Sequence, residues 1–194
     1  MKIVGPINYV DADISILGCT IKKGLQYFLS FIKNKGWVVI REDINEMILR
    51  GKYAGVDGCT MNIKYTKYKE IAEVEIDLPS EPRYKEQIYK NLVDAFNEKY
   101  GKGECSRHNS YYCDAFNCHA KWDFPKVEEF RDDAWYFGNN YISIDFRRYE
   151  YKFTNPQSDS LSIYFSDNIK RGKLDLEGQE AKKNKARGFS QTDI

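Results

Sequence analysis

Four residues with metal-ligating side chains lie close together in the second half of the sequence. Cys105, His108, Cys113 and Cys118 follow the spacing C-x2-H-x4-C-x4-C, and His119 comes directly after the last cysteine. Zinc prefers three or four soft ligands in a tetrahedron, and loops of two and four residues let a short chain wrap around one ion. The spacing equals that of a zinc knuckle in which Cys and His are exchanged at the second and third ligands. One interpretation is therefore a small module stabilised by a structural zinc ion.

The same segment has an interpretation in which no metal is bound. Residues 111–124 also resemble a strand, whose neighbouring side chains point to alternate faces and would not converge on one ion. Zinc knuckles place glycines near their ligands, and the interior of this segment contains none. Cysteines are often simply small buried hydrophobic residues. We accordingly expect no cofactor, with zinc as the alternative.

Cys19 is the candidate for nucleophilic catalysis. It lies just before a predicted helix, where the helix dipole could lower the pKa of its thiol. Its base would have to be His108 or His119, which are the two histidines of the sequence. The alternative is a buried structural cysteine in a turn between strand and helix. Because the sequence also contains no G-x-G-x-x-G, P-loop, H-E-x-x-H or G-x-S-x-G pattern, we expect a protein that is not an enzyme.

Aromatic residues are unusually frequent, since 15 Tyr, 11 Phe and 3 Trp make up 15% of the sequence. They are dense at Trp135, Tyr136, Phe137 and Tyr141. Tyr and Trp are favoured at recognition surfaces because they bury a large area at a low cost in entropy. These four residues are therefore a candidate binding surface for a protein partner. In the alternative interpretation, their rings fill the core or the second face of a sheet.

Two segments that would position these residues have the periodicity of amphipathic helices. Between Lys22 and Lys35, apolar residues recur at the i, i+3, i+4, i+7 spacing. Between Glu81 and Tyr100, apolar residues recur every four residues. Ser80 and Pro82 are suited to the start of this second predicted helix, and Gly101 follows its end. The residues predicted to lie in the core are Phe28, Ile32, Ile76, Leu92, Phe96, Ile144 and Ile163.

The remaining regular segments are predicted to be strands. A change of parity in one of them predicts a bulge or a tight bend at Arg147-Arg148. The acidic pairs Glu128-Glu129 and Asp132-Asp133 are expected in a solvated turn. The order of elements predicts an α+β fold of two α–β units, with two helices packed on one face of a meandering antiparallel sheet. The predicted strands are residues 37–40, 47–49, 60–65, 70–78, 111–124, 135–153 and 161–165.

Regular alternation of apolar residues ends near Asp167. We therefore predict a single α+β domain over residues 1–166 and a polar C-terminal tail over residues 167–194. Such a tail buries too little apolar surface to offset its ordering entropy. It is expected to be ordered by docking Leu174, Leu176 or Phe189 onto the domain or onto a partner chain.

The charge balance limits the classes of partner. The sequence has 30 Lys and Arg against 29 Asp and Glu, for a net charge of +1. Binding to nucleic acid or to anionic lipid is usually driven by a basic excess, so we expect neither a nucleic-acid nor a membrane partner. The odd number of cysteines prevents complete pairing and favours a cytoplasmic location. A periplasmic or secreted location would follow if a signal peptide has been removed.

Several short motifs resemble a group of uncharacterised small bacterial α+β proteins. Their pattern, apolar-x-G-I-x-I followed by L-x-x-K-G-F, is similar to Ile16-Leu17-Gly18-Cys19-Thr20-Ile21 and Ile32-Lys33-Asn34-Lys35-Gly36-Trp37. Residues 50–55, 96–101 and 163–169 also fit. The two-unit plan resembles the fold of β-lactamase-inhibitor-like proteins, which act by binding other proteins. The resemblance thus implies an inhibitor-like interaction domain with an unknown protein partner, and it implies no catalytic residues.

Overall fold

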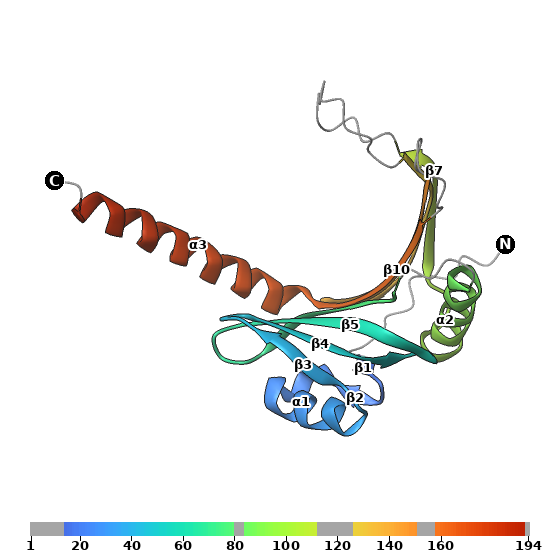
Figure 1. Cartoon of the computed structure of the whole chain (residues 1–194), viewed down its shortest axis with the longest axis horizontal. Helices are drawn as coiled ribbons and strands as arrows, with labels where there is room; N and C mark the ends of the chain where they lie inside the picture. Colours follow the sequence, from blue (N-terminus) through green and yellow to red (C-terminus); the bar gives the residue numbers. More distant parts are fainter. Residues whose placement is uncertain (1–13, 80–83, 112–125, 151–157, 193–194) are drawn as a thin grey trace.

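The structure is a computed structural model that describes residues 14–79, 84–111, 126–150 and 158–192 (Figure 1). Within these ranges a short hairpin leads into a helix and four strands, and then into a second helix, four strands and a final helix. The α+β class is confirmed, although the described chain has a third α-helix besides the two predicted. The elements are β1 (Ser15–Ile16), β2 (Cys19–Thr20), the 3-10 turn η1 (Ile21–Lys23), α1 (Leu25–Asn34), β3 (Val38–Glu42), β4 (Glu46–Tyr53), β5 (Val56–Tyr65), β6 (Ile71–Asp77), α2 (Lys85–Tyr100), β7 (Glu104–Tyr111), β8 (Lys126–Phe137), β9 (Asn140–Glu150), β10 (Ser158–Asp167) and α3 (Asn168–Thr192).

Eight strands of the described chain form one antiparallel sheet in the order β3-β4-β5-β6-β10-β9-β8-β7. Each α–β unit contributes a four-stranded meander. The last strands of the two units, β6 and β10, pair in the middle, with Ile76 opposite Ile163 and Val74 opposite Phe165. The order of strands from the centre outward is therefore the same in both halves, which confirms the predicted meandering sheet.

Helices α1 and α2 pack on the same face of this sheet. The register places Met61, Ile76, Ile163 and Ile144 side by side across four strands, and all four are fully buried. Both helices add apolar side chains to the same continuous core. Of the predicted core residues, Phe28, Ile32, Ile76, Leu92, Ile144 and Ile163 are buried, while Phe96 is partly buried against the core.

Both helices begin later than predicted. Helix α1 begins at Leu25, because Gly24, with a φ of 81°, separates it from the preceding 3-10 turn. Helix α2 begins at Lys85, and the predicted capping residues Ser80 and Pro82 lie outside the described residues. The predicted end of α2 is confirmed, since Gly101 has a φ of 82°, in the left-handed region that favours glycine.

One strand is predicted over residues 135–153, but residues 135–150 belong to two strands, and residues 151–153 lie outside the described part of the chain. Strand β8 ends at Phe137 and β9 begins at Asn140, because Gly138 reverses the chain with a φ of 59°. The predicted bulge at Arg147-Arg148 is also displaced. It lies on β8, between Val127 and Glu129, whereas β9 pairs with β10 without interruption. The predicted strand over residues 111–124 falls almost wholly outside the described residues.

The acidic segment that was expected to be a solvated turn is part of β8, so that prediction is wrong. Asp133 is 7% exposed and accepts a hydrogen bond from the hydroxyl of Tyr89 in α2. On the same face, Arg131 lies 3.4 Å from the Glu86 carboxylate of α2. Polar side chains thus occupy inward-facing positions of β8 because α2 supplies partners for them.

The predicted C-terminal tail forms helix α3, which continues from β10 and projects away from the sheet (Figure 1). Polar contacts hold its first turns: Lys173 lies 3.3 Å from the Glu70 carboxylate, and Glu177 accepts a hydrogen bond from the backbone of Lys67. Within the described residues, no helix has the length and apolar character needed to span a membrane. Of the three residues expected to dock, Leu174 is half-buried, Leu176 is 61% exposed and the side chain of Phe189 lies outside the described residues.

Candidate functional site

The face of the sheet opposite α1 and α2 is lined mainly by polar side chains, and it is here called the helix-free face because neither of these helices covers it; only the start of α3 contacts it, within the described residues. Figure 1 shows the sheet bent so that α1 and α2 lie on its outer side and α3 leaves from its inner side. The first turns of α3 contact β6 and β10, and the Arg171 guanidinium lies 3.4 Å from the Tyr141 hydroxyl of β9. The helix-free face is therefore a concave surface bordered by the start of α3.

Carboxyl groups from three strands lie near the centre of the helix-free face. The pairing register aligns four residues in one row across neighbouring strands: Asp77 of β6, Ser162 of β10, Asp145 of β9 and Asp132 of β8. Ser162 donates a hydrogen bond of 2.5 Å to Asp77, and Arg147 lies 3.5 Å from the Asp145 carboxylate. The row brings together residues that are as far as 85 positions apart in the chain.

Asp132 and Asp145 form a cross-strand pair of like charges. Burial, and next the charge of Asp145, raise the pKa of Asp132 from its ordinary value of 3.8 to about 6. Burial also raises the pKa of Asp145, which Arg147 opposes. Like charges directly opposite each other destabilise a sheet, so protonation of one member of the pair relieves this repulsion. One oxygen of Asp132, Oδ1, is buried and has no hydrogen-bond partner.

The neighbouring row contains a carboxyl-phenol pair. Tyr164 of β10 lies opposite Glu75 of β6, and its hydroxyl is hydrogen-bonded to the Glu75 carboxylate. Burial is the main cause of a raised pKa at both groups. Toward α3, Glu73 is bound by Lys64 at 2.7 Å. The face thus changes from ion-paired carboxylates beside α3 to carboxyl groups with raised pKa values at its centre.

The structure divides the predicted aromatic surface between two sides of the sheet. Trp135 and Phe137 are 3% and 0% exposed and belong to the core, so the prediction that they form a binding surface is wrong. Tyr136 is 54% exposed and lies with Tyr141 on the helix-free face, with ring centroids 6.2 Å apart. The division follows from strand geometry, because neighbouring residues point to opposite faces.

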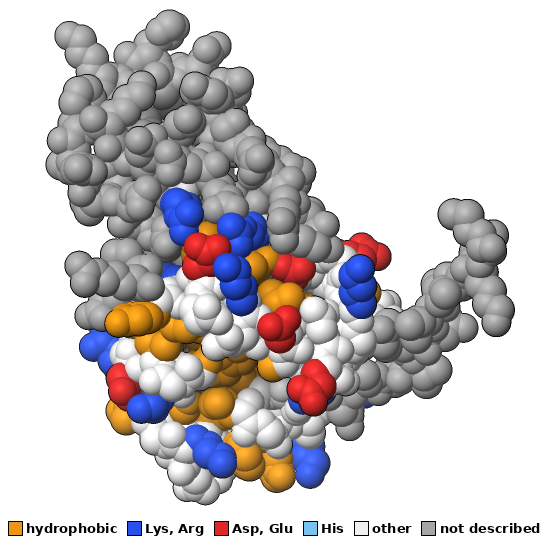
Figure 2. Space-filling view, turned by 90° about the vertical axis from the view of Figure 1, so that its right-hand side faces the viewer, with side chains coloured by type: hydrophobic (Ala, Val, Ile, Leu, Met, Phe, Trp, Pro, Cys, Tyr) orange, Lys and Arg blue, Asp and Glu red, His pale blue; other side chains and the backbone are white. Residues whose placement is uncertain are grey.

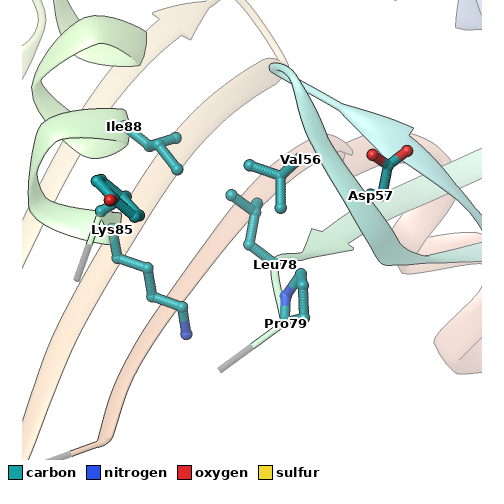
Figure 3. Close-up of a pocket in the computed structure, with 7 residues that line it drawn as sticks. Val56, Asp57, Leu78, Pro79, Lys85 and Ile88 are labelled. Carbon is teal, nitrogen blue, oxygen red and sulfur yellow. The ribbon is translucent and has the colours of Figure 1, made fainter. Parts of the chain in front are cut away.

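A cavity of about 380 Å³ lies between the first turn of α2, the start of β5 and the residues that follow β6. Figure 3 shows Ile88 of α2 facing Val56 and Leu78 across this space, with the side chain of Lys85 extending along its side. Lys85 is 2% exposed. In Figure 2, which views the molecule from the side where α2 lies, apolar side chains reach the surface between charged ones.

The thiol of Cys19 is buried beside the start of η1. Its side chain is 2% exposed, and burial raises the pKa of the thiol, opposed in part by Lys23. A raised pKa keeps the thiol protonated at neutral pH, which is the reverse of what a cysteine nucleophile needs. The environment of Cys19 therefore favours the structural interpretation of this residue.

The predicted zinc ligands lie largely outside the described part of the chain. Cys105 and His108 belong to strand β7, whereas Cys113 and Cys118 fall within residues 112–125, which are not described. Among the described residues, no three Cys, His, Asp or Glu side chains are grouped as metal ligands. The zinc-stabilised module stays a prediction.

Comparison of the chain with protein-family models, with curated proteins and with solved structures gives no match. Function therefore has to be inferred from the geometry of this chain. The sequence alone did not identify the carboxyl groups of Asp132, Asp145 and Glu75, or the buried Lys85. For Glu75 a signal was present, because Glu73, Glu75 and Asp77 alternate with buried residues in β6 and must share one face.

Proposed function

We propose that the protein is a non-enzymatic interaction domain that binds a protein partner through the helix-free face of its sheet. The observation that supports this proposal most directly is the shape and lining of that face. It is a broad, concave surface (Figure 1) whose outward-facing positions carry Tyr, Ser, Asp and Arg side chains, most of them half-buried, with Tyr136 exposed. Tyr and Arg are enriched in protein interfaces.

The rigidity of the face also supports binding. Its side chains stand on the central strands β6, β10, β9 and β8, whose opposite sides form the fully buried core. Side chains fixed on a packed sheet lose little conformational freedom when a partner arrives. The partly buried carboxyl pair of Asp132 and Asp145 would gain a counter-charge if the partner presents a Lys or Arg side chain, which adds specificity to the contact.

Site-specific photo-cross-linking tests the proposal. Tyr136 on the helix-free face and Tyr27 on α1 have similar exposures of 54% and 48%, so each can be replaced by p-benzoylphenylalanine as a matched pair. After irradiation in cells that express the protein, Tyr136→p-benzoylphenylalanine is expected to form a discrete heavier adduct with one protein. Tyr27→p-benzoylphenylalanine should form little of this adduct, because α1 packs on the opposite face.

Two further variants separate specific binding from random capture. Asp145→Arg in the Tyr136 cross-linking background reverses a central charge, and it should reduce the adduct strongly, since like charges across an interface cost several kcal/mol. Asp57→Arg changes a carboxylate near the start of β5 whose side chain is 81% exposed, and it should leave the adduct unchanged. Equal adducts from Tyr27 and Tyr136, or an adduct that ignores Asp145→Arg, would contradict the proposed use of this face.

A further inference from the structure

We infer, on the basis of the function proposed above, that the partner of the helix-free face is a second copy of this chain, whose α3 places its basic end across the row of carboxyl groups. The basic end of α3 is defined here as residues 179–192. Because the two chains are identical, each one places its α3 on the other. The dimer is then closed by a two-fold axis, the commonest symmetry of soluble oligomers.

The basic end of α3 lies beyond the sheet of its own chain. Within the described residues, the last polar contact of α3 with the sheet is the hydrogen bond from the backbone of Lys67 to Glu177. Residues 178–184 are all exposed. Figure 1 shows α3 as one continuous helix that leaves from the inner side of the sheet and points away from it. The basic end therefore does not reach the carboxyl row of its own chain, but it can reach that of another chain.

The charge of this end is strongly positive. Within the described residues, the ion pairs of α3 lie in its first turns, and neither Lys182 nor Lys183 takes part in one. Like charges three or four positions apart on a helix repel each other, so a surface of opposite charge stabilises this end. Its cationic residues are Lys182, Lys183, Lys185 and Arg187, against the single acidic residue Glu180.

The centre of the helix-free face supplies the opposite charge. Glu75 and Asp77 of β6 are hydrogen-bonded to the hydroxyls of β10, and Asp132 lies opposite another carboxyl group. None of these three residues is ion-paired within the described residues. Lys64 of β5 and Arg147 of β9 each lie beside a different carboxylate of the face. Three carboxyl groups thus face the concave side without a cation, and the basic end of α3 has cations without a carboxylate.

The dimensions of the two surfaces match. Residues 179–192 are helical, and at about 1.5 Å per residue they extend over roughly 20 Å. The carboxyl row crosses the neighbouring strands β6, β10, β9 and β8, which at about 4.8 Å between strands span roughly 15 Å. The basic end is therefore long enough to pass over the whole row. The concave shape of the face (Figure 1) lets a helix lie along it with contacts on both sides.

Size-exclusion chromatography with light scattering tests the inference on the intact chain at pH 7.5, where a carboxyl group with a pKa of about 6 is mostly ionised. At about 50 mM NaCl the mass should be twice that of one chain, and at about 500 mM NaCl it should fall toward that of one chain, because salt screens exposed charges. A single chain at both salt concentrations overturns the inference, and so does a dimer that salt does not weaken. If a single chain is found while Tyr136→p-benzoylphenylalanine still captures a different protein in cells, the proposed function stands and only the identity of the partner is wrong.

Charge reversal on each side identifies the two surfaces. Lys182→Glu combined with Lys183→Glu should weaken the dimer by about 100-fold or more, since like charges then meet across the interface. Glu75→Lys combined with Asp77→Lys should do the same from the other side. An equimolar mixture of the two double variants should form a dimer again, because each α3 then meets a face of opposite sign. Failure of the mixture to dimerise, with both variants folded by circular dichroism, overturns the inference.

A matched control changes the same charges elsewhere. Lys33 and Lys35 are exposed at the end of α1, on the other side of the sheet, so Lys33→Glu combined with Lys35→Glu should leave the dimer unchanged. Loss of the dimer in this control would show that only the net charge matters and would overturn the inference.

Carbodiimide cross-linking shows which residues meet, even if the β6 variant does not fold. The reagent joins an ammonium and a carboxylate that are in direct contact. In a mixture of unlabelled and isotope-labelled chains, Lys182 or Lys183 of one chain should be joined to Asp77 or Asp132 of the other, which gives peptide pairs of mixed label. Cross-links from these lysines that contain one label only, or none to the carboxyl row, overturn the inference.

Discussion

Replacing Asp132 by Asn is expected to stabilise the fold at neutral pH and to have little effect near pH 4. Asp132 of β8 lies directly opposite Asp145 of β9, and the pKa of Asp132 is raised to about 6 by burial and by the Asp145 charge. The Asn side chain has the same shape, carries no charge and can donate a hydrogen bond to the Asp145 carboxylate. The substitution therefore removes the repulsion and keeps the packing.

The sign of the effect follows from the raised pKa. When the pKa of a carboxyl group is higher in the folded state than in the unfolded state, the folded state binds the proton more tightly. Protonation of this group therefore stabilises the fold, and ionisation removes that stabilisation. This contribution is fully present below about pH 4 and is lost as the pH rises to about 6. A shift from 3.8 to about 6 corresponds to roughly 3 kcal/mol without screening. Because the pair faces solvent on one side, screening reduces the expected effect to about 1–2 kcal/mol.

Urea unfolding followed by circular dichroism at pH 4 and pH 7.5 measures this effect. The free energy of unfolding of Asp132→Asn should exceed that of the unmodified protein by about 1–2 kcal/mol at pH 7.5 and by less than about 0.5 kcal/mol at pH 4. Asp94→Asn on the exposed side of α2 is the matched control and should change the free energy by less than about 0.5 kcal/mol at both pH values.

Two results would refute this reasoning. If Asp132→Asn destabilises the fold equally at both pH values, the carboxyl group contributes through a hydrogen bond that Asn cannot replace. A gain in stability that is the same at pH 4 and pH 7.5 would likewise show that repulsion between Asp132 and Asp145 is not its cause.

Two further predictions concern the packing of the domain. Gly51→Ala should destabilise the fold by about 1–3 kcal/mol or more in urea unfolding, because a Cβ there would overlap the Trp37 indole. Gly178→Ala is the control, because a Cβ at this position of α3 meets nothing within 4 Å; it should raise the helicity of α3 slightly. Tyr89→Phe should cost about 1–3 kcal/mol in the same assay, because it leaves the buried Asp133 without this hydrogen-bond donor; a loss below about 0.5 kcal/mol would show that Asp133 does not depend on Tyr89.

The sequence was most informative where one amphipathic pattern decided both the type and the orientation of an element. The apolar residues of α1 recur at helical spacing, and the buried ones include Phe28 and Ile32, as predicted. In β6, Val74 and Ile76 alternate with charged residues and face the core. Such patterns can be read without the fold, because a helix or a strand with one apolar face has to bury it.

Prediction failed where the partners of a side chain come from another part of the chain. The acidic segment of β8 has no apolar alternation, yet it pairs as a strand with β7 and β9, and Tyr89 and Glu86 of α2 bind its inward-facing Asp133 and Arg131. Likewise, the choice of Trp135 and Phe137 as surface residues rested on their type, whereas their burial depends on which face of β8 meets α2. Sequence periodicity contains no information about such partners.

What the sequence by itself determined is the α+β class, the two helices and the existence of a polar C-terminal segment. Only the tertiary structure decided the composition of the helix-free face and of the cavity. Asp77 joins the row of Asp132 and Asp145 because β6 pairs with β10, a contact between the two halves of the chain. Lys85 becomes buried because α2 docks beside the ends of β5 and β6. Both arrangements depend on long-range strand register and helix docking, which no local pattern of residues specifies.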